Sequence, residues 1–141
     1  MDYYAAARKL LALKTSLEHF PLNRHLLELT RGEFFVLDYL NQKNAVNPKE
    51  LSRVMSVSTA RVAVLLKHME EKGWILKTHD PRDSRQILVS ITESGISTFE
   101  ARYRETLLQA AALLKALGPE DAKSLLRIEE KIIHIFSSDL N

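Results

Sequence analysis

Residues 47–92, NPKELSRVMSVSTARVAVLLKHMEEKGWILKTHDPRDSRQILVSIT, decide the fold. They begin with a helix-start signal, because Asn47 can cap a helix and Pro48 suits its first position. Glu50 lies three residues after Asn47, where a carboxylate can complete a capping box. The apolar residues that follow recur on one side of a short helix. The stretch therefore opens with a capped amphipathic helix.

A second helix follows after a break of three residues, Ser56-Val57-Ser58. Such a break fits only a sharp turn, and Ser58 is a suitable N-cap for a helix over about residues 59–72. Gly73 is typical of a left-handed C-cap. The apolar stripe of this helix consists of Val62, Leu65, Leu66 and Met69. The pattern predicts a helix-turn-helix whose two helices meet at a steep angle.

Two strands and a charged tip complete the stretch. Residues 74–79 lose the helical period and residues 85–92 alternate apolar side chains on one face, which predicts an antiparallel hairpin. Its tip, residues 80–84, is a projecting loop or wing. One or two extended residues near Val46 are expected to add a third short strand. This is the geometry of a nucleic-acid-binding protein, in which the second helix enters the major groove and the wing reaches phosphates or the minor groove.

Three runs carry a resemblance to a known family: MEEKGWI at 69–75, DPRDSR at 80–85 and VSITESG at 89–95. They resemble the multiple antibiotic resistance regulator (MarR) family of bacterial winged-helix transcription factors, and the second run is similar to its wing signature, Asp-x-Arg-Asp-x-Arg. The resemblance covers roughly residues 30–136. It implies a homodimer, and a ligand cleft for small aromatic or phenolic compounds where the dimer helices meet the winged lobe.

Composition narrows the class of protein. The chain has 141 residues, 45% apolar and 27% charged, which suits one globular domain with its own core. It has no run of about 18 apolar residues and no signal-peptide pattern, so we expect a cytoplasmic protein without a membrane span. The absence of cysteine excludes disulfides, thiolate metal sites and a cysteine redox switch.

The small net charge of +2 is unevenly distributed. Residues 47–92 hold eight Lys/Arg and five Asp/Glu, giving +3, whereas residues 93–141 hold six and eight, giving −2. A basic excess in the winged stretch is what a phosphate-facing surface requires, although a difference of a few charges is equally compatible with chance.

The sequence offers no site for catalysis. The five histidines have no carboxylate partners at metal-ligand spacing, and there is no glycine-rich phosphate loop or Gly-x-Ser-x-Gly elbow. We therefore expect neither a metal nor a cofactor, and we expect that the protein is not an enzyme.

The region before the winged stretch is also helical. Residues 2–20 carry an apolar stripe at helical spacing, and Pro21 ends or bends this helix. Residues 22–29 are expected to form one more turn or a connector. Thr30-Arg31-Gly32-Glu33 has the pattern of a capping box, which predicts the start of the next helix.

Two further helices follow the hairpin. Thr92 is the expected cap of a long helix over about residues 93–117, and a last helix covers about residues 119–136. The last helix carries two adjacent apolar stripes, whereas one is enough to pack on a molecule's own core. The surplus favours a symmetric dimer built from the terminal helices of both chains. The alternative is that these helices pack on one another within a monomer.

The predicted fold class is therefore mainly α with a small β-hairpin (α+β): a winged helix-turn-helix with N- and C-terminal dimerisation helices. Residues 1–29 and 93–141 form the predicted dimerisation region. Residues 30–92 form the predicted DNA-binding region, within a single intertwined domain.

Candidate DNA contacts share the exposed side of the second helix: Ser58, Thr59, Ala60, Arg61, Ala63, Val64, Lys67 and His68. Arg61 suits guanine or a phosphate, the apolar residues suit thymine methyl groups, and the polar residues suit the DNA backbone. The resembled family tends to have Thr and Arg where Ala63 and Val64 stand, which favours thymine contacts and DNA shape. Lys67 and His68 are equally compatible with a solvated helix face. The apolar residues also leave open a winged-helix module that binds another protein instead of DNA.

Candidate contacts in the wing follow from the resemblance, which implies that Arg82 enters the minor groove while Arg85 pairs with Asp80 or Asp83 to hold the loop. A narrow A·T-rich groove is strongly negative and suits a guanidinium on a tight loop. The alternative is an ordinary solvated hairpin tip.

Together these features predict a DNA-binding transcriptional regulator that acts as a repressor. It binds double-stranded DNA as a homodimer at a pseudo-palindromic operator with half-sites about one helical turn apart. Release by a small aromatic ligand is part of this hypothesis, the ligand favouring a dimer whose helix spacing does not match DNA. Candidate ligand-binding residues are Tyr3, His19, Phe20, Phe34, Phe35 and Trp74, although such aromatic residues more often belong to a core.

Overall fold

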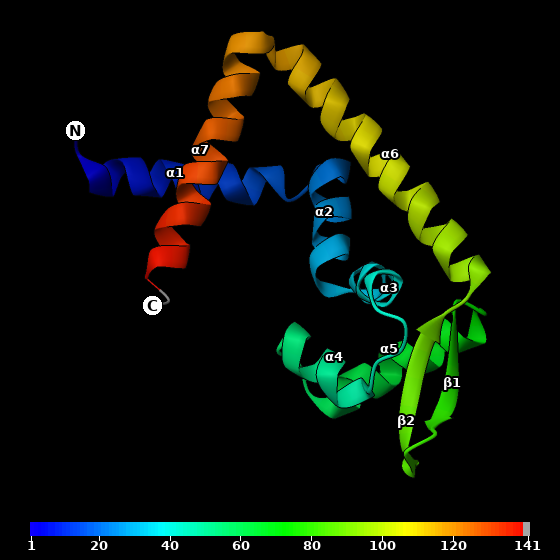
Figure 1. The fold of residues 1–141 in the computed structure, drawn as a ribbon. Helices are drawn as coiled ribbons and strands as arrows, with labels where there is room; N and C mark the ends of the chain where they lie inside the picture. The colour runs from blue at the N-terminus through cyan, green and yellow to red at the C-terminus, as the bar shows by residue number, and fades with distance from the viewer. Residues whose placement is uncertain (140–141) are drawn as a thin grey trace. The chain divides into compact units, whose positions relative to one another are not determined.

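The computed structural model describes residues 1–139. Its elements, shown in Figure 1, are α1 (Tyr3–Leu17), α2 (Pro21–Arg31), α3 (Glu33–Gln42), α4 (Pro48–Met55), α5 (Thr59–Glu71), β1 (Ile75–Asp80), β2 (Asp83–Ile91), α6 (Glu93–Leu117) and α7 (Pro119–Ser138). The chain divides into two compact units, an N-terminal unit from Met1 to Arg104 and a C-terminal unit that begins at Glu105. The fold class predicted from the sequence is confirmed.

Both helices of the helix-turn-helix begin at their predicted caps. The Asn47 side chain accepts a 2.8 Å hydrogen bond from the backbone N–H two residues later, and Ser58 Oγ accepts a 3.1 Å bond from the N–H three residues later. Ser56, with φ of 53°, ends α4 in the left-handed region. Glu50 does not complete the predicted capping box, because its carboxylate lies 3.8 Å from the Arg53 guanidinium.

Two predictions about the N-terminal helices are wrong. Residues 22–29 are not a connector, because Pro21 takes the first position of the eleven-residue helix α2. Thr30 is not a cap either, since it lies within α2 and its hydroxyl donates to the Leu27 carbonyl at 3.0 Å. The N-cap of α3 is Gly32, which has no side chain to cap with. The Thr30–Glu33 capping pattern therefore arises by coincidence at the junction of two helices.

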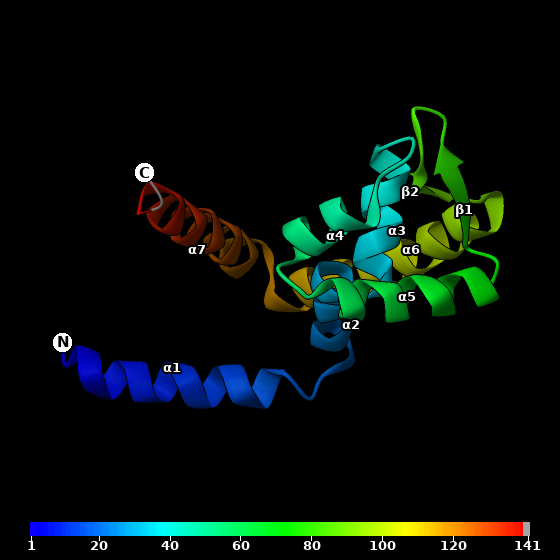
Figure 2. The ribbon, with the colours of Figure 1, turned by 90° about the horizontal axis from the view of Figure 1, so that it is seen from below.

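The two strands pair antiparallel from Ile75↔Ile91 to Asp80↔Asp83. The loop at the tip is therefore shorter than the predicted residues 80–84, since only Pro81 and Arg82 lie between the strands. Backbone pairing continues past the point where the alternation of apolar residues stops. Val46 does extend the sheet, but by a single bridge to Val89 with hydrogen bonds of 3.0 and 2.8 Å. Within the N-terminal unit, the hairpin projects beyond the neighbouring helices (Figures 1 and 2).

The core of the N-terminal unit draws on α3, α4, α5, both strands and the start of α6. Its buried residues are Val36, Leu37, Leu40, Val46, Leu51, Val62, Leu66, Met69, Ile75, Val89 and Phe99. Thr92 caps α6 as predicted, because its Oγ1 accepts from Gly95 N at 3.0 Å and donates to the Gly73 carbonyl at 2.7 Å. Gly73, with φ of 76°, ends α5 as expected for a left-handed residue. One core thus supports the helix-turn-helix and the wing together.

The terminal helices are different, since neither α1 nor α7 contains a buried residue. Their exposed large apolar residues are Tyr3, Tyr4, Leu10, Leu11, Leu13 and Leu17 in α1, and Leu126, Ile128, Ile132, Ile133, Ile135 and Phe136 in α7. Within residues 1–139, no helix has the length and apolar character that crossing a bilayer requires.

Candidate nucleic-acid interface

The residues predicted to face DNA from α5 do share one solvent-exposed side. Ser58, Thr59, Ala60, Arg61, Ala63, Val64, Lys67 and His68 are all exposed. The opposite side of the helix is fixed to the core by Val62, Leu66 and Met69, which are almost fully buried. We call α5 the recognition helix because its inner side is held by the core while its outer side is available to a partner.

The outer side of the recognition helix is unusually apolar at its centre. Val64 is 65% exposed and is flanked by the exposed methyl groups of Ala60 and Ala63. Small apolar side chains on a recognition helix match the C5-methyl group of thymine, which projects into the major groove.

The eight cations of residues 47–92 fall into two groups. Four are paired with acids: Arg53 with Glu50, Lys72 with Glu33, Lys77 with Glu70, and Arg85 with Asp83. The other four have no ion pair or side-chain hydrogen bond within residues 1–139: Lys49, Arg61, Lys67 and Arg82. The unpaired group includes two residues of the recognition helix and the tip of the wing. These are the positions from which a cation can reach phosphates without first breaking an ion pair.

The wing is braced by its own polar residues. Arg85 donates to Asp83 through Nε at 3.0 Å and through its guanidinium NH2 at 3.3 Å, and its backbone N–H also donates to Asp83 at 3.1 Å. These bonds lower the pKa of the Asp83 carboxyl below its ordinary value. The side-chain bond from Arg85 has the larger effect and the backbone bond the smaller one. Asp80 accepts from the backbone N–H of Arg82 at 2.9 Å. Of the two acids that the sequence left open, Asp83 is the one that pairs with Arg85.

Sequence reasoning missed a further brace in the wing. The Nδ1 atom of His79 lies 2.8 Å from the Ser84 carbonyl oxygen, which ties the end of β1 to the start of β2. The bond spans the tip, where Arg82 is exposed to solvent. No sequence motif marks it, because a lone histidine in a strand has no distinctive spacing.

The most informative departure from expectation concerns His68. The sequence suggested a DNA contact, but the His68 Nδ1 atom contacts the carboxylate of Glu33, which lies at the start of α3. The other oxygen of Glu33 lies 3.2 Å from Lys72 Nζ. Glu33 had been given only a local capping role, and its partners are 35 and 39 residues away in sequence.

The aromatic residues suggested for a ligand do not gather in one place. Phe34 and Trp74 lie against each other with ring centroids 6.1 Å apart, and Phe35 stacks on Tyr39. Tyr3, His19 and Phe20 are exposed near the N-terminus. The rings in the winged region therefore contribute to packing, as the alternative interpretation of aromatic stripes expected.

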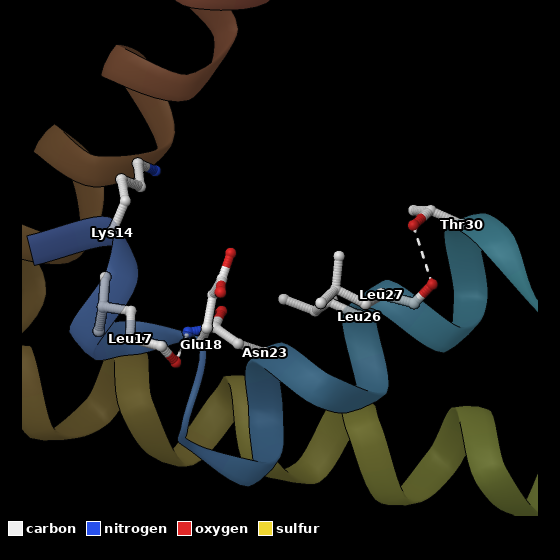
Figure 3. Close-up of a pocket in the computed structure, with 7 residues that line it drawn as sticks. All are labelled: Lys14, Leu17, Glu18, Asn23, Leu26, Leu27 and Thr30. Carbon is white, nitrogen blue, oxygen red and sulfur yellow. Dashed lines mark hydrogen bonds between the residues drawn. The ribbon is translucent and has the colours of Figure 1, made fainter. Parts of the chain in front are cut away.

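A separate cavity of about 250 Å³ lies at the elbow between α1 and α2 (Figure 3). Its lining is Lys14, Leu17, Glu18, Asn23, Leu26, Leu27 and Thr30, none of which was a predicted ligand residue. The lining combines leucine side chains with one ammonium and one carboxylate. In the described part of the chain, no group of three or more potential metal ligands is present.

Comparison with known proteins identifies the family. The sequence profile of the MarR family matches residues 29–87. The transcriptional repressor MdtR of Bacillus subtilis is 30% identical over an alignment of 105 residues, and the match covers 64% of this chain and 68% of MdtR. The chain belongs to the MarR family. The resemblance seen in the sequence is thereby confirmed, and because this family consists of transcriptional regulators, so is the expectation that the protein is not an enzyme.

Other relatives agree with this assignment. The multiple antibiotic resistance protein MarR of Salmonella typhimurium is 33% identical over 81 residues, 56% of each chain. The crystal structure of YusO from B. subtilis has a TM-score of 0.77 at 21% identity, covering 95% of this chain and 98% of YusO. A mutant of MepR from S. aureus, bound to an oligodeoxyribonucleotide, has a TM-score of 0.60 at 19% identity, covering 94% and 97%. The chain spans 62% of the curated relative YfiV and 56% of MarR.

Proposed function

We propose that this protein is a DNA-binding transcriptional repressor that acts as a homodimer on a pseudo-palindromic, A·T-rich operator. The recognition helices of two copies enter successive major grooves, and the wings reach the flanking minor grooves. Chromosomal DNA as partner implies a cytoplasmic location. The repressor role is supported by similarity to MdtR, which is named a transcriptional repressor.

The observation that carries the proposal is the division of the basic residues into paired and unpaired groups. Arg61 and Lys67 on the recognition helix and Arg82 on the wing have no acid partner within residues 1–139. In contrast, Arg53, Lys72, Lys77 and Arg85 each lie beside an acid. Unpaired cations placed on a helix and a projecting loop suit phosphate contacts, since no internal ion pair must be given up on binding.

The proposal of a homodimer is supported by the terminal helices. Both α1 and α7 lack buried residues and expose many leucine, isoleucine and aromatic side chains. Many exposed large apolar side chains on one helix are typical of an interface between chains, and a two-fold symmetric interface sets two recognition helices at a fixed spacing. The MepR neighbour bound to an oligodeoxyribonucleotide gives the DNA part of the proposal a precedent in a protein of similar fold.

We further propose that a small aromatic acid releases the repressor from DNA. The cavity between α1 and α2 has room for a single ring, with Leu17 and Leu26 to contact the ring and Lys14 to meet a carboxylate. Such a ligand acts only if it binds the DNA-incompetent dimer more tightly than the competent one.

The test begins with selection of bound duplexes from random DNA, followed by affinity measurements by fluorescence anisotropy over a range of salt concentrations. Replacing Arg82 with alanine is expected to weaken binding to the selected duplex about tenfold and to reduce the salt slope by about 1, the value for one lost phosphate contact.

The matched control is Arg24→Ala, which removes an equal charge from an exposed position on α2. This control should keep the salt slope of the wild-type protein. If the wild-type protein binds no duplex at moderate salt, the proposal is contradicted. That outcome would favour the protein-interaction module, whose partner would then contact Ala60, Ala63 and Val64.

A further inference from the structure

The carboxylate of Glu33 is the meeting point of two side chains from the recognition helix. One oxygen contacts His68 Nδ1, and the other lies 3.2 Å from Lys72 Nζ. The Glu33 side chain is only 19% exposed, whereas those of His68 and Lys72 are 54% and 38% exposed. A single acid at the first turn of α3 therefore holds two successive turns of α5.

An aromatic contact reinforces this junction. The Lys72 ammonium lies 4.3 Å from the centroid of the Trp74 ring, and that ring lies 6.1 Å from Phe34, the residue after Glu33. We name these five residues, Glu33, Phe34, His68, Lys72 and Trp74, the α3–α5 clamp. The clamp joins the start of α3 to the C-terminal half of the recognition helix and to the segment that leaves it.

The clamp supplies a constraint that the core cannot. Val62, Leu66 and Met69 set the distance of α5 from the core, but apolar contacts have no preferred direction and resist rolling of the helix only weakly. Charged hydrogen bonds are directional. Because a helix with its side chains has a radius of about 5–6 Å, a roll of about 10° moves its outer atoms by roughly 1 Å. Contacts to base edges do not tolerate such a shift.

We propose that Glu33 is a positioning residue for DNA recognition, which fixes the roll of the recognition helix without touching DNA itself. The inference rests on the proposed function and deepens it. Base-edge contacts depend on the roll, whereas long lysine and arginine side chains can follow a phosphate that moves by 1 Å or so. Loss of Glu33 therefore lowers specific affinity more than non-specific affinity.

The experiment compares Glu33→Gln with the wild-type protein on the selected operator and on a scrambled duplex of equal length. Glutamine keeps the shape of the side chain but not its charge. Operator affinity should fall about tenfold, roughly the loss of one base contact, while affinity for the scrambled duplex stays equal or rises. The ratio of the two affinities is the quantity that tests the inference.

The matched control is Glu70→Gln on the recognition helix itself, which breaks an ion pair with Lys77 at 3.6 Å and changes the net charge equally. Its affinity ratio should equal that of the wild-type protein. A merely structural role for Glu33 would reduce the folded fraction and weaken both affinities alike, which leaves the ratio unchanged and overturns the inference.

If the Glu33→Gln variant unfolds, a mutant cycle that changes the partners of Glu33 tests the same inference. Replacing His68 with glutamine and Lys72 with methionine removes both partners while Glu33 stays, and this variant should show the same fall in ratio. In that background, Glu33→Gln should have no further effect on the ratio. Additive losses would overturn the inference. If the wild-type protein itself prefers no duplex, the proposed function is refuted. If the wild-type protein prefers the operator and Glu33→Gln keeps that preference, only the role of Glu33 is refuted.

Discussion

The winged region and the terminal helices of this chain differ in how far they bury their apolar side chains. From α3 to β2, leucine, valine, isoleucine and methionine side chains converge on one core, where Leu40, Leu51 and Met69 are completely buried. In α1 and α7 no residue is buried. One region completes its own core from a single chain, and the other leaves its apolar residues for another surface to cover.

This difference teaches how rigidity and assembly are divided in the molecule. A recognition surface must be held within fractions of an ångström. Contacts supplied by one chain, the core together with the α3–α5 clamp, can do so at any protein concentration. The proposed interface between two copies would instead depend on protein concentration, because a second chain must cover it.

The largest expected effect comes from placing charges on the apolar side of α7. Ile133 and Phe136 are 64% and 66% exposed, and replacing both with glutamate should prevent a second copy from packing there. Operator affinity is expected to fall by about 10²–10⁴, because the two half-site contacts lose their linkage. Analytical ultracentrifugation should show a monomer at micromolar concentration.

The control for this prediction is Lys131→Gln, which changes an exposed polar residue of the same helix. This variant should remain dimeric and should bind DNA as the wild-type protein does. If the double glutamate variant stays dimeric with full affinity, α7 does not form the interface and the contrast between the two regions disappears.

A pair of leucine truncations compares the two regions directly. Leu40 is fully buried, and Leu40→Ala should lower the free energy of unfolding by about 2–5 kcal/mol. Leu126 in α7 is 52% exposed, and Leu126→Ala should act mainly by weakening assembly. Denaturant unfolding over a range of protein concentrations separates the two cases. An effect of Leu126→Ala that persists at concentrations where the wild-type protein is monomeric would show that α7 is stabilised within its own chain.

A smaller effect is expected from the proposed contact between Val64 and DNA. Replacing thymine by uracil in the selected operator removes one methyl group, and at the position that Val64 contacts the affinity should fall about fourfold, the effect of losing one buried methyl-sized group. The Val64→Ala variant should no longer distinguish thymine from uracil there. Leu76→Ala, which removes an exposed apolar side chain from β1, should keep the distinction. Equal binding of thymine and uracil at every position would assign specificity to DNA shape instead.

The smallest effect concerns the brace of the wing. Because the Arg85 bonds lower the pKa of Asp83 in the folded protein, the stability that this pair contributes is present above the ordinary Asp pKa of about 3.9. It is lost as the pH falls through the lower folded-state pKa. An NMR titration of the Asp83 carboxyl should therefore have its midpoint below about 3.9. Arg85→Ala should raise that midpoint, whereas Arg82→Ala should leave it unchanged.

Sequence patterns were most accurate where structure depends on neighbours in the chain. Asn47, Ser58 and Thr92 cap their helices as expected, and Gly73 takes the left-handed conformation at the end of α5. Each of these assignments needs only a side chain and a backbone N–H a few residues away, or a permitted φ. The same local reasoning failed at Thr30, because nothing nearby reveals that α2 continues through this residue.

Contacts between distant segments were beyond such reasoning. His68 was predicted to lie on a solvated or DNA-facing surface, but it contacts Glu33, 35 residues away in sequence. Lys72, for which the sequence predicted no contact, lies beside the same carboxylate. Arg85 had two candidate acids, Asp80 and Asp83, and only the structure shows that it pairs with Asp83. The separation of paired from unpaired cations likewise depends on which acids the fold brings near.

By itself, the sequence determined the helix-turn-helix, the hairpin, the long helix after it and the membership of a regulator family. It could do so because caps, left-handed glycines and apolar periodicity act over a few residues. Only the tertiary structure decided that Glu33 contacts His68 of the recognition helix and Lys72 at its end. It also decided that Arg61, Lys67 and Arg82 have no acid partner within residues 1–139. Those outcomes depend on which side chains come together when α3, α5 and the hairpin pack around one core. No local pattern in the sequence shows which residues from distant segments will be neighbours.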